Sequence, residues 1–191
     1  MLNKNFAIIA IHLVGDIVSE GTAFGSLFYP EVVRRGVIAK CNEAFAKVAT
    51  VGGLVVPARI AFKEDFSDAD LNIPLLAMAQ QAGALINGQP GADLIDALVL
   101  PANTHVLTHK RPGPFTDSGL KELLDSHGIT DVIVCGVATN ASVESTVRQA
   151  SDLGFRTYVL EDACSAADQA AHDAAIASMG LFGKAITLAD L

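Results

Sequence analysis

The alternation of short apolar runs with segments of helical periodicity is the feature that most constrains the fold of this chain. Several of the runs are rich in Val and Ile, and they occupy residues 6–11, 54–62, 105–108, 132–137, 157–160 and 185–187. Such runs are typical of parallel strands that are buried on both faces of a sheet. The segments of helical spacing between them are residues 30–51, 71–82, 118–127, 141–153 and 168–179. The pattern predicts a three-layer α/β/α fold, doubly wound around a mostly parallel six-stranded sheet.

The length and the turn residues predict one domain over residues 1–191. Gly128 and Gly154 follow predicted helices at the position where a left-handed residue commonly ends a helix. A chain of 191 residues with 51% hydrophobic content can bury one sizeable core. No repeat or linker interrupts the sequence, and we interpret INGQPG, residues 86–91, as a cluster of tight turns.

The composition argues against several classes of partner. The formal net charge is −8 and only 18% of residues are charged, which disfavours a basic face for nucleic acid. The apolar run near the N-terminus is short and lacks a small-residue cleavage site, so we interpret it as a buried strand and expect no membrane partner. Cys41, Cys135 and Cys164 are odd in number and lack metal-like spacing, which predicts ordinary packing and a reducing, cytoplasmic location.

Three strand ends carry unusual polar residues. In a doubly wound sheet, ligands bind outside the carboxyl ends of the strands, which directs attention to residues 12–16, 109–115 and 136–142. Backbone amides near Ala138 and Ser142, at a strand-to-helix turn, could hold a developing oxyanion. A nucleophile is often placed at such a turn, because the same amides favour negative charge.

Seven short motifs, spread over nearly the whole chain, carry a resemblance to a known family. They are AIIAI (7–11), PARIAF (57–62), INGQPG (86–91), the loop with Lys110, Arg111 and Phe115, GVATNASVEST (136–146), GFRTYVLEDAC (154–164) and His172. With them the sequence resembles the isochorismatase-like hydrolases, also called the cysteine hydrolase superfamily, which include nicotinamidases, N-carbamoylsarcosine amidases and isochorismatases. The pairing of GVAT with VEST is highly specific to that family.

The resemblance implies a catalytic Asp after the first strand, a Lys after the third, and a Cys in the turn after GVAT. In this sequence His12 stands at the Asp position and Ser142 at the Cys position, while either His109 or Lys110 corresponds to the Lys. In the implied mechanism the carboxylate takes the thiol proton, the ammonium lowers the thiol pKa, and the thiolate attacks a carbonyl. A serine needs a stronger base, and a neutral imidazole from His12 or His109 is suited to that role, with Lys110 as an electrostatic aid.

Each of these residues also has a purely structural interpretation. Ser142 could cap a helix, because serine at a helix start is a common capping residue. His12 could be a hydrogen-bonded, half-buried side chain, and His109 and Lys110 could belong to a solvated loop. Asp16, four residues after His12, is expected to cap or brace its loop.

The same motifs indicate residues for a substrate pocket and argue against a cofactor site. Arg59 and Lys110 could neutralise a substrate anion, and Phe24, Phe62 and Phe115 could form walls beside Ala138. Nicotinamidase-type members carry Asp and His metal ligands after the second strand. The corresponding residues 59–65 read RIAFKED and contain no histidine, so we expect neither a metal nor another cofactor.

The leading hypothesis is a hydrolase that acts on an amide-like or vinyl-ether group of a small polar or carboxylated molecule. The alternative is a catalytically silent family member that binds a metabolite or serves in an assembly. A third interpretation makes Ser142 a deliberate replacement of a cysteine, which leaves His12 unexplained. Family resemblance, and a helix face with Val37, Cys41 and Phe45 that looks too apolar for a lone domain, predict a homo-oligomer.

Overall fold

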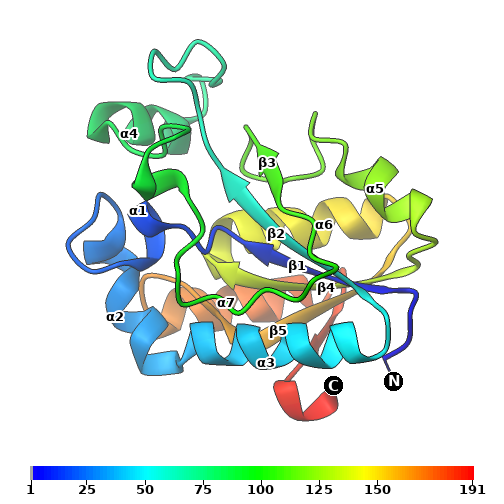
Figure 1. Cartoon of the computed structure of the whole chain (residues 1–191). Helices are drawn as coiled ribbons and strands as arrows, with labels where there is room; N and C mark the ends of the chain where they lie inside the picture. Colours follow the sequence, from blue (N-terminus) through cyan, green and yellow to red (C-terminus); the bar gives the residue numbers. More distant parts are fainter. Residues whose placement is uncertain (1) are drawn as a thin grey trace.

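A six-stranded sheet forms the middle layer of the computed structural model, which describes residues 2–191 (Figure 1). The strand order is β3-β2-β1-β4-β5-β6, and every neighbouring pair is parallel. The strands are β1 (Phe6–Ile11), β2 (Leu54–Ile60), β3 (Leu107–His109), β4 (Asp131–Val137), β5 (Arg156–Ser165) and β6 (Lys184–Ile186). All residues of β1 and β4 are buried, as the continuous apolar runs predict.

Helices cover both faces of the sheet. They are α1 (Gly15–Val18), α2 (Gly25–Arg35), α3 (Val37–Thr50), α4 (Pro74–Ala82), α5 (Leu120–Ser126), α6 (Glu144–Asp152) and α7 (Gln169–Met179). Helix α3 packs on β1, β2 and β5 at the front of the sheet in Figure 1, and α6 lies behind it. Helix α4 stands apart, above the carboxyl ends of the strands. The doubly wound α/β prediction is therefore confirmed.

The helix predicted over residues 30–51 is in fact two helices. Gly36 separates α2 from α3 and has a left-handed backbone, with φ of 65°. A residue without Cβ adopts this conformation readily, and here it ends α2 and lets α3 begin in a new direction. Helix α2 begins at Gly25, ahead of Pro30, which lies inside the helix rather than at its start.

The apolar face of α3 is part of the core of its own chain. Val37, Cys41 and Phe45 are fully buried within the one chain, at the spacing that keeps them on one side of a helix. The prediction that this face is exposed for oligomerisation is wrong, because the sheet already covers it. Between residues 2 and 191, no helix has both the length and the apolar character needed to cross a bilayer.

Candidate active site

The carboxyl ends of β1 and β4 approach each other closely at a glycine. Ile11 pairs with Gly136, and a Cβ atom added to Gly136 would lie 2.2 Å from the Ile11 carbonyl oxygen. Gly136 also has φ of 110°, which side chains rarely tolerate. Glycine at this position therefore lets the residue after β1, His12, and the turn after β4 lie at the same edge of the sheet.

Two histidines meet at this edge. His12 follows β1 with a left-handed backbone, and its backbone N–H donates to the Ala58 carbonyl of β2, at 2.9 Å. His109 ends β3 and pairs with Ile60, also on β2. The two side chains are almost completely buried, their ring planes are within 19° of parallel, and their Nε2 atoms are 3.0 Å apart. Strand β2 thus brings together residues that are 97 positions apart in the sequence.

The protonation of the pair follows from its hydrogen bonds. The Arg111 carbonyl lies 2.8 Å from His109 Nδ1, and because a carbonyl only accepts, Nδ1 carries the proton. His109 Nε2 then has no proton, and its lone pair accepts a hydrogen bond from His12 Nε2–H. His12 Nδ1 is left as a free base. Burial lowers the pKa of His12 well below 6.5, with His109 as a second cause, and burial lowers the pKa of His109 to about 4. Both rings are neutral at pH 7.

Ser142 lies in an irregular turn at the end of β4. Residues Thr139–Val143 are π-helical, and the Ala138 carbonyl accepts from the N–H groups of both Ala141 and Val143, at 3.1 and 3.2 Å. Single π-helical turns are frequent at functional sites. Ser142 is buried inside this turn, whereas the residue that caps α6 is Val143, so the capping interpretation of Ser142 is wrong.

His12 and Ser142 face the same cavity, whose volume is about 60 Å³. It is bounded by α1, α2, the turn after β4 and the lid formed by α4. Apart from His12 and Ser142, its walls are apolar: Ile17, Phe24, Phe28, Ile60, Leu75, Leu76, Ala79, Leu85, Val137, Ala138 and Ala141. Among the described residues, no hydrogen bond directly joins the Ser142 hydroxyl to His12.

Comparison with known proteins places this chain in a family. Residues 7–190 match the family model described as the isochorismatase domain. The chain belongs to the isochorismatase domain family. A ureidoacrylate amidohydrolase, RutB, from Enterobacter sp. (strain 638) is 38% identical over 205 residues, covering 98% of this chain and 87% of the relative. A probable inactive nicotinamidase from Arabidopsis thaliana is 25% identical over 186 residues, covering 94% and 90% of the two chains.

Solved structures of isochorismatase-family proteins have the same fold. The isochorismatase family protein from Desulfovibrio vulgaris superposes with a TM-score of 0.85 at 23% identity, over 98% of this chain and 96% of that one. Other curated relatives are matched over shorter stretches, and this chain spans only 34% to 45% of their length.

Within this isochorismatase-family chain, Lys110 lies away from the cavity. Its ammonium forms an ion pair with Asp68, at 2.8 Å, and donates to the Ala61 carbonyl. It also lies 5.7 Å from the centre of the Phe62 ring. His109, and not Lys110, therefore contacts His12, and the expectation that His109 belongs to a solvated loop is wrong.

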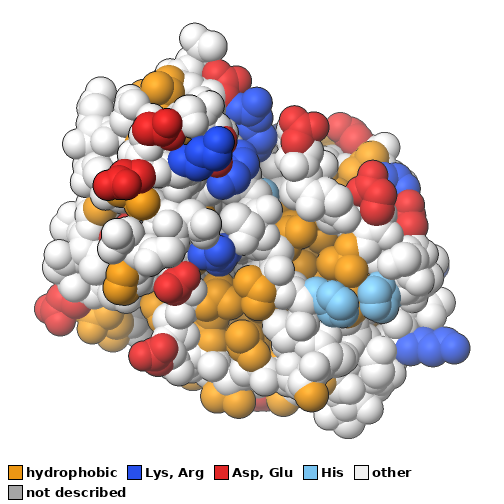
Figure 2. All heavy atoms as spheres, turned by 45° about the horizontal axis from the view of Figure 1, so that its top comes forward, with side chains coloured by type: hydrophobic (Ala, Val, Ile, Leu, Met, Phe, Trp, Pro, Cys, Tyr) orange, Lys and Arg blue, Asp and Glu red, His pale blue; other side chains and the backbone are white. Residues whose placement is uncertain are grey.

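Of the cations and aromatic walls predicted for the pocket, only Phe24 lines the cavity. Arg59 is tied to Thr108, Asn87, Asp93 and the Ala92 carbonyl, outside the cavity. Figure 2, in which the top of Figure 1 comes forward, shows basic side chains beside acidic ones in its upper part. Phe24 does line the cavity. Phe62 instead packs against Phe66, and Phe115 against Phe155.

Sequence reasoning missed Phe28, and it predicted the helix over residues 71–82 without its place at the cavity. Phe28 follows the correctly predicted Phe24 by one helical turn, and that spacing was the available signal. Leu75 and Leu76 of α4 reach the cavity only because of where the chain folds back, which no local pattern shows. The expected bracing by Asp16 is confirmed, since its carboxylate accepts the Leu85 N–H at 2.7 Å.

Within the described part of the chain, the cysteines and the potential metal ligands form no second centre. All three cysteines are buried, and Cys41 Sγ lies 3.7 Å from Cys135 Sγ. Burial raises the pKa of Cys164, and the contact between Cys135 and Cys41 raises the pKa of Cys135, so these thiols stay protonated. Over residues 2–191, no group of three or more His, Cys, Asp or Glu residues is placed to hold a metal ion.

Proposed function

We propose that this isochorismatase-family protein is a hydrolase in which the Ser142 hydroxyl attacks the carbonyl of a small, uncharged amide or ester. His12 acts as the general base and His109 orients it. The observation that carries the proposal is the buried contact of 3.0 Å between the two Nε2 atoms, with the Arg111 carbonyl fixing both tautomers. A base oriented by a third group next to a potential nucleophile is the arrangement used in acyl transfer.

The proposed steps use only groups that face the cavity. Ser142 Oγ bonds to the carbonyl carbon while its proton moves to His12 Nδ1, and the carbonyl oxygen becomes an oxyanion at the start of the turn Thr139–Val143. His12, now an imidazolium, donates this proton to the leaving nitrogen or oxygen as the bond to carbon breaks. Water then attacks the acyl-serine by the same route, which releases a carboxylic acid and restores Ser142.

The neutral His109 ring supports the imidazolium less strongly than a carboxylate would, because it offers a lone pair without a charge. The proposal also requires the contact between Ser142 and His12 to close when a substrate binds. Such contacts commonly tighten only in the complex with substrate.

The walls of the cavity define the substrate class. Nearly all are apolar, and the cations once expected to bind an anion are paired with Asp68 and Asp93 instead. A charged substrate would lose its hydration without a counter-ion, at a cost of several kcal/mol. The substrate class therefore changes from the carboxylated molecules first expected to small uncharged carbonyl compounds. The amidohydrolase name of the relative from Enterobacter supports C–N cleavage.

The test compares small uncharged amides and esters with carboxylated analogues of equal size. We expect turnover of the uncharged set only, and a loss of at least about a thousandfold in kcat for Ser142→Ala. A fluorophosphonate probe should label the wild type at residue 142. Ser151→Ala, on the neighbouring helix α6, is the matched control and should keep wild-type activity. Unchanged activity in Ser142→Ala would remove this residue from the mechanism.

A catalytically silent protein that binds an uncharged metabolite is the second candidate. The missing hydrogen bond between Ser142 and His12 favours it, as does the similarity to a probable inactive nicotinamidase. A substrate screen without turnover, together with a cavity ligand that raises the melting temperature, would favour this function.

Homo-oligomerisation in the cytoplasm remains part of the proposal, although the predicted face on α3 is excluded. Helix α2 instead exposes Leu27 and Val33, at 48% and 58% of their surface, and these are better candidates for a contact. Light scattering at micromolar concentration tests this, and a monomer would contradict it.

A further inference from the structure

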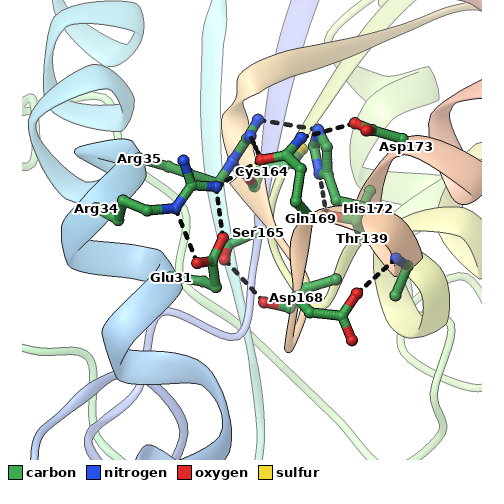
Figure 3. A network of polar contacts seen from close by, with 12 residues as sticks. Glu31, Arg34, Arg35, Thr139, Cys164, Ser165, Asp168, Gln169, His172 and Asp173 are labelled. Atoms are coloured by element: carbon green, nitrogen blue, oxygen red, sulfur yellow. Dashed lines mark hydrogen bonds and ion pairs between the residues drawn. The ribbon is translucent and has the colours of Figure 1, made fainter.

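A polar network, buried at its His172–Thr139 end, connects α2 to the turn that carries Ser142 (Figure 3). Arg35, the last residue of α2, donates from Nε to the Cys164 carbonyl at 2.7 Å and from Nη2 to the Glu161 carbonyl at 2.9 Å. The same Nη2 lies 2.9 Å from His172 Nε2 on α7. On the other side of the ring, His172 Nδ1 lies 2.9 Å from the Thr139 hydroxyl. The guanidinium thus joins β5 and α7 to the first residue of the turn.

The donors and acceptors of this network permit one arrangement. Arginine only donates, so His172 Nε2 is a lone pair and Nδ1 carries the proton. His172 therefore donates to the Thr139 oxygen. Thr139 is fully buried and His172 is only 3% exposed, so water cannot replace either partner. Loss of one bond would leave a buried polar group unpaired.

Burial and the neighbouring arginines keep the His172 ring neutral. Arg35 and Arg34 face it from α2, together with Glu31, and Asp173 lies next to it on α7. Burial is the main cause that lowers the pKa of His172 to about 4, and the positive charge of Arg35 is the next. A proton on Nε2 would place two donors against each other and break the link to Arg35.

We propose that Arg35 and His172 are positioning residues that hold the turn Thr139–Val143, and with it Ser142, at a fixed place opposite the cavity wall on α2. The wall residue Phe28 and Arg35 belong to the same helix, so the network fixes two sides of the cavity relative to each other. The role of Ser142 rests on the proposed function, whereas the effect of Arg35 and His172 on the turn is independent of that function.

The test exchanges the hydroxyl that His172 contacts. Thr139→Val removes the acceptor and keeps the shape, whereas Thr139→Ser keeps the acceptor and serves as the matched variant. Amide hydrogen exchange is measured at Ala141 and Val143, whose N–H groups both bond to the Ala138 carbonyl, with β1 as internal reference. We expect at least tenfold faster exchange in Thr139→Val, less than twofold change in Thr139→Ser, and no change in β1.

Activity gives the second readout. Thr139→Val should lower kcat at least tenfold with little change in KM, and the exposed His127→Gln should behave as wild type. If the wild type turns over no substrate, the proposed function fails, yet the exchange rates still decide the positioning role. If Thr139→Val does not fold, Arg35→Met and Arg35→Lys are compared in the same way. Wild-type exchange in Thr139→Val or Arg35→Met, or equal exchange in the two members of either pair, would overturn the inference.

Discussion

Acid should destabilise this protein strongly between pH 6.5 and pH 4, because the folded chain buries histidines in their neutral form. An unfolded chain binds a proton at each histidine with a pKa near 6.5, whereas His109 and His172 in the folded chain bind theirs only near pH 4. Their contribution to stability is therefore complete above pH 6.5 and is lost as the pH falls. The neutral His109 ring accounts for about 3 kcal/mol of this loss, since one pKa unit corresponds to about 1.4 kcal/mol, and the less deeply buried His172 accounts for about half as much. His12, whose pKa is also lowered, adds to this loss.

Urea unfolding followed by circular dichroism, at several pH values and constant ionic strength, measures the effect. We expect the free energy of unfolding to fall by about 4 kcal/mol or more from pH 7 to pH 4, which is a large fraction of the stability of a typical domain. His109→Gln and His172→Gln should each remove about one proton from the slope. The exposed His127→Gln should leave the slope unchanged. A free energy of unfolding that is constant between pH 7 and pH 5 would refute the reasoning.

Three further predictions concern the site. Gly136→Ala should cost about 3 kcal/mol or more, because its methyl group would lie 2.2 Å from a backbone oxygen of β1, whereas Gly128→Ala, with open space around it, should cost only about 1 kcal/mol by urea unfolding. If His12 is the base, kcat should rise with pH through a midpoint below 6.5, and this acid limb should vanish in His12→Gln. Replacing His12 by Asp and Ser142 by Cys should give amidase activity only when His109 is also replaced by Lys, which an amide hydrolysis assay of the double and triple variants checks.

The strands and their carboxyl ends could be predicted because the signals are local. Continuous apolar runs gave β1 and β4 nearly to the residue, and the turn after β4 followed from its glycine. The helix break at Gly36 was missed, because both sides of it have the same helical spacing. Strand β3 is short and half exposed, so its bounds were shifted by a few residues.

The contacts within the site depended on register and on distant loops. His12 and His109 were both nominated, but their pairing requires β3 to align with β2 at Ile60. Lys110 was a candidate because the family resemblance implies a lysine after the third strand, where either His109 or Lys110 corresponds to it. Adjacent residues at the end of a strand point in opposite directions, and the loop after β2 supplies Asp68 on the other side.

The three residues of the proposed site share one electrostatic property, which is that none of them is charged at neutral pH. The family resemblance implies an acid, an ammonium and a thiol, which act as charged groups, whereas His12, His109 and Ser142 are neutral at pH 7. A charged pair in an apolar cavity needs exact compensation, and loss of one member would leave a buried charge costing about 3–5 kcal/mol. The three neutral groups carry no charge that needs compensation, and the Arg111 carbonyl keeps the proton of His109 on Nδ1. Replacement of a single member by its charged counterpart should therefore be worse than replacement of all three, which makes the three residues one unit rather than three independent losses.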